Sequence, residues 1–289
     1  LFMPLAIYAL ARGNSPSNPG GWSAPEVIGC FIVAGAALAW FIVAELRNPA
    51  PLLQIRLLAE RNFGISMAVL TLFAIGMLGG TYLLPLYMQR GLGYTALAAG
   101  SMFLPVGVIQ GVLSAVSGYL TRYVRPLLLS AAGILIMALS FWLASRFTLH
   151  TTHGHILFIL YLRGFGMGLT FAPLNLFSLK NLTQQDMAAA AGISNSIKQL
   201  AGSIGIALLT VIFSARTSYH AAHETVSAAQ TYVEGVTDAL RVVAVITLAA
   251  LLPLLGVFRK KRQGKSGVKG AATPSPGEAV SGKTDKTTI

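Results

Sequence analysis

The segment LYLRGFGMGLTFAPL, residues 160–174, lies inside an apolar run from about residue 155 to 178 and carries a full positive charge at Arg163. A helix needs about 20 predominantly apolar residues to cross the hydrocarbon core of a bilayer, and this run has that length. Only helices and closed barrels satisfy every backbone polar group in lipid. The run lacks the alternation of apolar and polar residues that is typical of barrel strands, so it predicts a transmembrane helix.

The composition of the whole chain indicates the same environment. Of its 289 residues, 54% are hydrophobic and only 10% are charged, and the mean hydropathy is +0.68. A soluble domain of this size carries about 25% charged residues. The expected fold class is therefore all-α, a polytopic transmembrane helical bundle. Spans are predicted near residues 27–45, 64–88, 96–120, 126–146, 155–178, 188–213 and 239–258.

The chain is expected to divide into three regions. Residues 1–62 are predicted to hold a partial helix, an outer loop at 11–26, a second helix, and an amphipathic segment on the cytoplasmic surface. Residues 63–258 are predicted to form a six-helix transmembrane bundle, in which the polar connection at 214–238 is partly helical. Residues 259–289 are rich in Gly, Lys, Ser, Thr and Pro, which predicts a disordered basic cytoplasmic tail. The apolar opening is too short to span, so we expect the chain to be a fragment of a longer protein.

The net charge of +12 is compatible with nucleic-acid binding, but the position of the charges argues against it. The densest basic run, FRKKRQGK at residues 258–265, directly follows the last predicted span. Basic residues in that position mark the cytoplasmic flank of a span. The connections on the same side as this run are richer in Arg and Lys than those on the other side. We therefore expect a cytoplasmic C-terminus, the lipid bilayer as a partner, and no nucleic-acid partner.

Signals for enzyme chemistry are lacking in the sequence. Cys30 is the single cysteine, so neither a disulfide framework nor a cysteine-built metal site is expected. Three histidines in the loop near residues 150–155 have no carboxylate beside them, which makes a metal site improbable. The sequence also contains no phosphate-binding loop, HExxH or GxSxG motif. We expect no cofactor, no metal and no enzymatic activity.

Arg163 is the first candidate for a substrate pathway. It lies eight residues after His155 at the outer end of its span, about 12 Å along a helix axis. Its head group either snorkels to the membrane surface or faces a cavity. Charges within spans cost about 2.5–3.5 kcal/mol on insertion scales and usually face the bundle interior or a water-filled pathway. Because Gly164, Gly166 and Gly168 give the guanidinium no shielding side chain, we favour the cavity-facing role.

Three amide side chains inside the predicted spans are further pathway candidates. Gln110 lies mid-span, where an unpaired amide is costly. Asn175 follows Pro173, so it either pairs with a backbone group that the proline frees or lines a pathway. Asn195 either bonds across helices or lines a pathway.

Small residues spaced four apart predict faces where helix backbones approach closely. Lipid supplies no hydrophobic force between helices, so such faces stabilise bundles by van der Waals contact. The glycines expected to act in this way are Gly107, Gly111, Gly164, Gly168 and Gly202.

The connection GYLTRYVRP, residues 118–126, resembles the cytoplasmic loop motif Gly-x-Leu-x-Asp-Arg-x-Gly-Arg of major facilitator superfamily transporters. Gly118, Leu120, Arg122 and Arg125 match that motif, whereas Thr121 and Val124 replace its Asp and second Gly. The resemblance implies that Gly118, Arg122 and Arg125 form a cytoplasmic hinge or gate. Loss of the Asp removes the charge relay that the complete motif implies.

Two longer stretches, residues 79–108 and 187–220, resemble the fourteen-helix multidrug:proton antiporters of the EmrB/QacA type. So does the span that ends at Glu45, followed by NPAPLLQIRLLAERNF. The resemblance implies the C-terminal portion of such a transporter, in a bacterial-type plasma membrane. It further implies multidrug efflux by proton antiport, with protons, a small amphipathic or cationic substrate and a missing N-terminal six-helix half as partners. The later spans contain no central Asp or Glu, so the proton-carrying carboxylates are expected mainly in that half.

Two other functions remain open at this stage. A non-transporting membrane subunit or remnant fits a fragment of this kind. A membrane-embedded transferase would need paired His, Asp or Glu at a membrane face, and the sequence shows no such pair.

Overall fold

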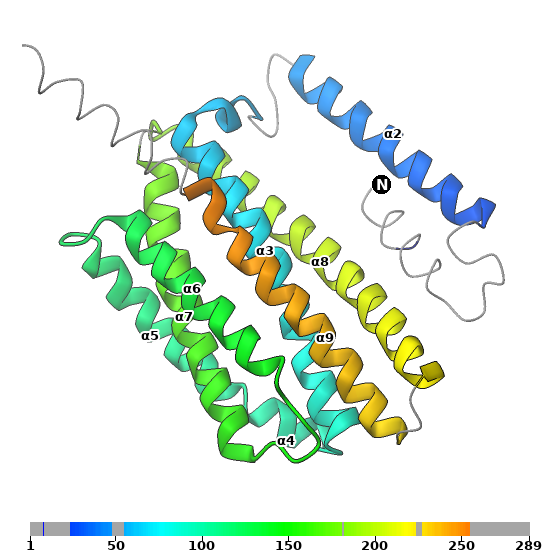
Figure 1. Cartoon of the computed structure of the whole chain (residues 1–289). Helices are drawn as coiled ribbons and strands as arrows, with labels where there is room; N and C mark the ends of the chain where they lie inside the picture. The colour runs from blue at the N-terminus through cyan, green and yellow to red at the C-terminus, as the bar shows by residue number, and fades with distance from the viewer. Residues whose placement is uncertain (1–7, 9–23, 48–54, 181, 224–226, 255–289) are drawn as a thin grey trace, which may run out of the picture. The chain divides into compact units, whose positions relative to one another are not determined.

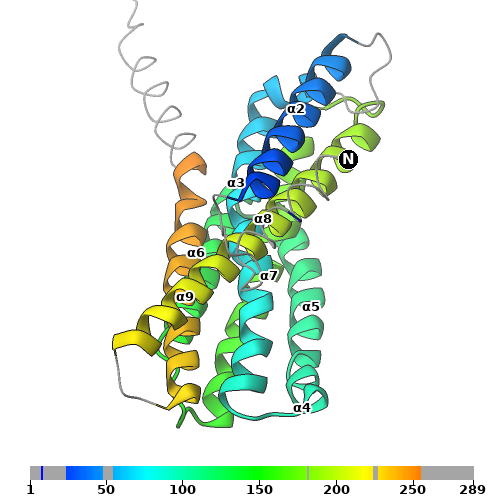
Figure 2. The ribbon, with the colours of Figure 1, turned by 90° about the vertical axis from the view of Figure 1, so that its right-hand side faces the viewer.

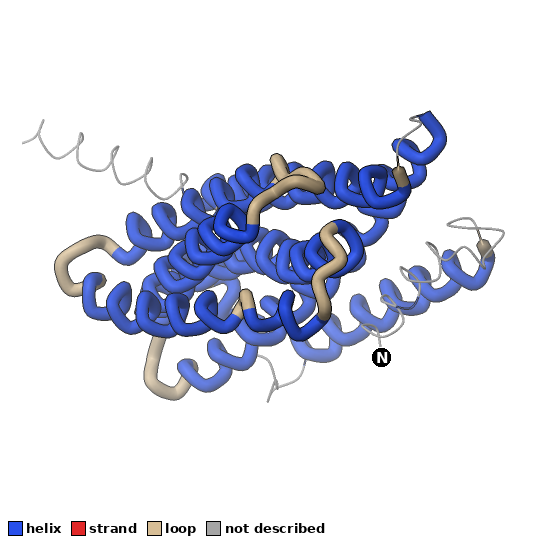
Figure 3. Tube along the Cα trace, turned by 90° about the horizontal axis from the view of Figure 1, so that it is seen from below, coloured by secondary structure: helices blue, strands red, loops and turns tan. Residues whose placement is uncertain are grey.

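The computed structural model describes residue 8 and residues 24–47, 55–180, 182–223 and 227–254. The predicted outer loop up to residue 23 and the predicted tail at 259–289 lie outside these residues. All regular elements of the described part are helical, and short loops join them (Figure 3). The predicted all-α fold class is confirmed.

Six helices of the described part are long and apolar enough to cross a membrane. Helix α2, Pro25–Arg47, precedes them at the position predicted for a span at 27–45, and the short helix η2, Ile55–Ala59, falls in the predicted amphipathic segment. The elements of the bundle are α3 (Arg61–Leu86) with η3 (Tyr87–Gly91), α4 (Ala96–Ser101) with α5 (Leu104–Leu120), α6 (Pro126–Ala144), α7 (His153–Leu179), α8 (Met187–His223) and α9 (Ala228–Ala249) (Figure 1).

Local sequence sets where several of these helices begin. The carboxylate of Glu60 accepts a hydrogen bond of 2.9 Å from the backbone N–H of Phe63 and so caps α3. Ser227 caps α9 in the same way through the N–H of Gln230. Pro126 stands in the first turn of α6, where its missing N–H costs nothing.

The second span of the bundle is divided into α4 and α5, as Figure 2 shows. The division falls at Met102 and Phe103, just before Pro105 in the first turn of α5. The proline ring has no N–H and clashes with the carbonyl four residues earlier, so the helix is interrupted there.

The bundle consists of two groups of three helices. Helix α7 packs against α5 and α6, while α3, α8 and α9 all pack against one another. Contacts of α6 with α9 and of α3 with α7 join the two groups.

Helices α8 and α9 extend beyond the predicted spans into the connection at 214–238, which was predicted to be partly helical. Helix α8 has 37 residues, about 55 Å at 1.5 Å per residue, which exceeds a hydrocarbon core of about 30 Å. Much of the connection predicted at 214–238 is therefore helical. Asp238 of α9 holds the two helix ends together: its carboxylate lies 3.8 Å from Arg216 Nε and 3.1 Å from His220 Nε2 of α8.

Candidate substrate-facing site

Arg163 is buried between helices. Its side chain is 2% exposed and reaches from α7 to α3. Nη2 donates to the carbonyl oxygen of Met77 at 3.0 Å and to the hydroxyl of Thr81, while Nη1 donates to the carbonyl oxygen of Gly80 at 3.4 Å. The guanidinium also lies 5.3 Å from the centre of the Phe141 ring on α6. The arginine thus joins three helices.

This position differs from the cavity-facing one that we expected, and it is not a snorkelling position either. The acceptors belong to one turn of α3, more than 80 residues earlier in the chain, and no carboxylate is paired with Arg163 within the described residues. Sequence gave no direct signal for these acceptors, because backbone carbonyls are present at every position. Within this structure Arg163 is a contact between helices.

The other pathway candidates are more accessible. Asn175 on α7 and Asn195 on α8 are exposed, and Gln110 on α5 is half-buried. Gln199, one turn after Asn195, is exposed as well. These amides lie on three of the helices of the bundle. Because they are exposed, they are able to contact another protein segment or a solute.

Lys198 of α8 contacts an aromatic ring of α7. Its Nζ lies 5.8 Å from the centre of the Phe171 ring, which is one turn before Asn175 on α7. Phe171 in turn meets the edge of Phe73 on α3, with 5.5 Å between ring centres. In the sequence, the only indication of this cation–aromatic contact is the presence of Phe171 four positions before Asn175.

The backbone of Gln110 approaches the same helix. A methyl group placed on Gly168 of α7 would lie 2.9 Å from the backbone oxygen of Gln110. The structure therefore places Gln110 on α5 beside α7, and places Asn175 and Asn195 on α7 and α8, which the contact of Lys198 with Phe171 links. It does not bring Arg163 into this group.

The predicted glycine contacts differ in outcome. A methyl group on Gly164 would lie 3.1 Å from the backbone oxygen of Val106, and one on Gly202 would overlap the side chain of Leu78. In contrast, Gly107 and Gly111 are exposed, and nothing lies within 4 Å of a methyl group at either position. Their face of α5 is open within the described part of the chain.

The loop at residues 118–126 is accessible. Arg122 lies over the ring of Tyr119 at 5.3 Å, and Gly118 has open space where a side chain would be. Arg125 is the residue at the start of α6. A hydrogen bond of 3.2 Å joins the hydroxyls of Tyr119 and Tyr123 and raises the pKa of the Tyr123 phenol. The two arginines form no ion pair with the described residues, in keeping with the absent Asp.

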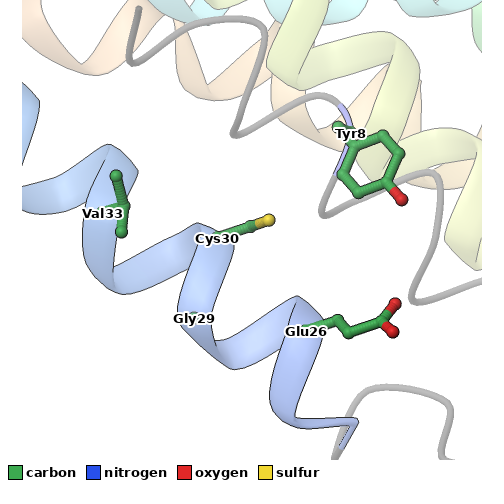
Figure 4. A pocket seen from close by; sticks show the side chains of 5 residues that line it. All are labelled: Tyr8, Glu26, Gly29, Cys30 and Val33. Atoms are coloured by element: carbon green, nitrogen blue, oxygen red, sulfur yellow. The ribbon is translucent and has the colours of Figure 1, made fainter.

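A separate pocket lies beside α2. Glu26, Gly29, Cys30 and Val33 of this helix line it together with Tyr8, and Cys30 and Glu26 project toward Tyr8 (Figure 4). None of the predicted pathway residues lines this pocket. Groups of three or more His, Cys, Asp or Glu suited to a metal ion do not occur in the described ranges.

Comparison with known proteins identifies the family. The Major Facilitator Superfamily model matches residues 1–206. The MFS-type transporter YhcA of Bacillus subtilis is 30% identical over 212 residues, which cover 73% of this chain and 40% of YhcA. The multidrug export protein EmrB of Escherichia coli is 32% identical over 207 residues, covering 71% of this chain and 40% of EmrB. The fatty acid resistance protein FarB of Neisseria gonorrhoeae is 30% identical over 195 residues, covering 68% and 38%.

The aligned part of the chain thus spans about two fifths of the length of these relatives. The described helices agree with the match, because they form a multi-pass membrane bundle. The chain therefore belongs to the major facilitator superfamily and is of the EmrB/QacA type.

Proposed function

We propose that this chain is part of a multidrug efflux transporter that exports amphipathic compounds in exchange for protons. The other half of the transporter would be an N-terminal six-helix bundle, which precedes these helices in the full-length protein. Transporters of this architecture bind substrate near the membrane midplane, at the contact between two bundles that rock against each other. The name of the relative EmrB, a multidrug export protein, supports this activity.

One observation carries the proposal: exposed amides lie on α7 and α8, two helices that a contact between Lys198 and Phe171 links. Asn175, Asn195 and Gln199 are exposed, and Lys198 lies against the ring of Phe171. An amide side chain at membrane depth needs a polar partner, and a solute in a wet pathway supplies one. Gln110 would extend this surface onto α5. We assign Arg163 a supporting role that holds α7 to α3, and we retain Gly118, Arg122 and Arg125 as the hinge.

A transport assay in inverted membrane vesicles that contain the full-length protein tests the activity. With an inward-acid gradient, we expect a fluorescent cationic dye to accumulate inside the vesicles and to leak out after a protonophore is added. Replacement of Asn195 or Asn175 by Ala should lower the initial rate about tenfold, the effect of losing one or two hydrogen bonds. Gln184→Ala, an exposed amide in the connection before α8, is the matched control. Accumulation that does not respond to the protonophore would contradict proton exchange.

Lys198 favours a second substrate class, amphiphilic anions. An ammonium group next to exposed amides and an aromatic ring attracts a carboxylate with an apolar tail. The relative FarB is named for fatty acid resistance, which supports this alternative. In the same vesicles, Lys198→Gln should slow the export of a fluorescent fatty acid and leave the rate with a cationic dye unchanged or higher.

A further inference from the structure

A pocket of about 520 Å³ lies between the end of α6 and the first half of α9. It is at the opposite end of α6 from Arg122 and Arg125. Two arginines, one carboxylate and several hydroxyl or aromatic side chains line the pocket. The lining residues used below are Trp142, Arg146, Thr148, Glu234 and Arg241.

The wall formed by the loop after α6 is held in place by buried contacts. The hydroxyl of Tyr87 donates a hydrogen bond of 2.7 Å to the carbonyl oxygen of Thr148. The ring of Tyr87 also stacks on Phe147, with 4.9 Å between centres and 18° between planes. A pocket wall fixed in this way is formed before a ligand arrives, which lowers the entropic cost of binding.

The charges in the pocket differ in how well they are paired. Arg146 lies 5.9 Å from the centre of the Trp142 ring, is exposed, and has no ion pair within the described residues. Arg241 is paired with Asp238 at 2.8 Å. Glu234 Oε1 accepts from Gln230, but the buried Oε2 has no hydrogen-bond partner in the described part, and His220 Nδ1 lies 3.5 Å away. The pocket therefore offers the guanidinium of Arg146 to an anion, and the Glu234 side chain, which is 31% exposed, offers its carboxylate to a cation.

Both helices that border the pocket carry exposed apolar side chains that lead away from it. On α6 these are Leu135, Leu139 and Trp142, and on α9 they are Val245, Leu248 and Leu252. Within each helix they are spaced three or four residues apart, so they lie on one face. Arg241 lies four residues before Val245 and so begins the stripe on α9. Such a stripe below a charged pocket fits the acyl chains of a lipid whose head group occupies the pocket.

We propose that this pocket binds the head group of a glycerophospholipid with a primary ammonium, that is, a phosphatidylethanolamine. The phosphate would accept hydrogen bonds from Arg146, and the ammonium would donate to the carboxylate of Glu234. The acyl chains would lie along α6 and α9. Arginine suits this role because its guanidinium binds phosphate through two parallel hydrogen bonds.

Native mass spectrometry of the protein, extracted in mild detergent and titrated with single lipids, tests the proposal. We expect phosphatidylethanolamine to remain bound about tenfold more strongly than phosphatidylcholine, whose trimethylated head group cannot donate to Glu234. Arg146→Gln should reduce the retention of phosphatidylethanolamine about tenfold. Arg56→Gln, an exposed arginine in η2, is the matched control and should leave retention unchanged.

Three outcomes would overturn the proposal. The first is equal retention of the two lipids by the unaltered protein, a comparison that does not depend on the folding of any variant. The second is an Arg146→Gln protein that melts at the same temperature as the control and retains the lipid fully. The third is displacement of the lipid by soluble phosphoethanolamine or inorganic phosphate at equal concentration, which would assign the pocket to a soluble phosphate compound.

Discussion

At the scale of the residue, Arg163 shows how a buried cation is accommodated without a carboxylate. A charged group removed from water is strongly disfavoured unless its donors find acceptors. Met77, Gly80 and Thr81 supply three acceptors from consecutive positions on one face of α3. The planar guanidinium reaches all of them at once and packs against Phe141. Its charge is therefore dispersed over helix carbonyls and a ring rather than neutralised.

This geometry predicts different results for two substitutions of Arg163. Lysine keeps the charge but has one compact ammonium, so Arg163→Lys should lower the free energy of unfolding by about 1–3 kcal/mol. Methionine removes the charge and has an apolar chain of similar length, so Arg163→Met should be less destabilising than lysine. Thermal unfolding in detergent, followed by intrinsic fluorescence, measures both. Equal melting temperatures for the lysine variant and the unaltered protein would contradict this account.

The sequence indicated that Arg163 is exceptional but not where its side chain lies. A charge in an apolar run predicts a polar environment, and the side chain was expected to face a cavity. The partners are instead backbone carbonyls of α3, a group that every helix offers. Only the packing of α7 against α3 determines which of them are within reach.

At the scale of the element, glycine decides which helices touch. Gly166 of α7 and Gly133 of α6 face each other: a methyl group on Gly166 would lie 2.8 Å from the backbone nitrogen of Met137 and 2.9 Å from the carbonyl oxygen of Gly133. Backbone atoms in a helix cannot move aside as a flexible side chain does. The contact between α6 and α7 therefore depends on the absence of a side chain at these positions.

A matched pair of glycine substitutions tests this conclusion. Gly166→Ala should destabilise the bundle by about 1–3 kcal/mol, because the added methyl overpacks the contact. Gly107→Ala places the same methyl in open space on α5 and should leave stability unchanged or raise it by up to about 1 kcal/mol, since alanine favours helix. Melting temperatures of the two variants in the same detergent decide between these expectations. A larger loss for Gly107→Ala would show that its face is covered in the protein.

The positions of the spans followed from hydrophobicity, but some helix ends did not. Helices α5 and α6 begin or end within a few residues of the predicted limits, because polar or basic residues flank them closely. Helices α8 and α9 continue into segments such as SARTSYHAA, which are polar yet contain good helix formers. Hydropathy predicts only the limits of the segment that contacts lipid. It carries no signal for a helix that continues into water and is held there by charges such as Asp238 and His220.

At the scale of the whole molecule, Arg163 connects the two groups of three helices. It extends from α7, which packs with α5 and α6, to α3, which packs with α8 and α9. The other connection is the packing of α6 against α9. Contacts at both places favour movement of the bundle as one body, which the proposed rocking of two bundles would require.

The orientation of the bundle in the membrane is a further prediction at this scale. With Cys30 replaced by Ser, Tyr123→Cys near the loop motif and His150→Cys in the loop after α6 each provide a single thiol. A membrane-impermeant maleimide should label His150→Cys in intact cells, and should label Tyr123→Cys only after the cells are opened. This result is expected because basic residues favour the cytoplasmic side. Labelling of Tyr123→Cys in intact cells would reverse the orientation.

The long ends of α8 and α9 that meet at Asp238 also bear on how this protein can be imaged. A membrane protein enclosed by a detergent belt gives single-particle electron micrographs few features by which to align the particles. Two helix ends clamped by Asp238, Arg216 and His220 form a stiff epitope outside that belt. An antibody fragment raised against this epitope would be rigidly attached to the bundle. The direction of the fragment in the images would then give the tilt of the bundle.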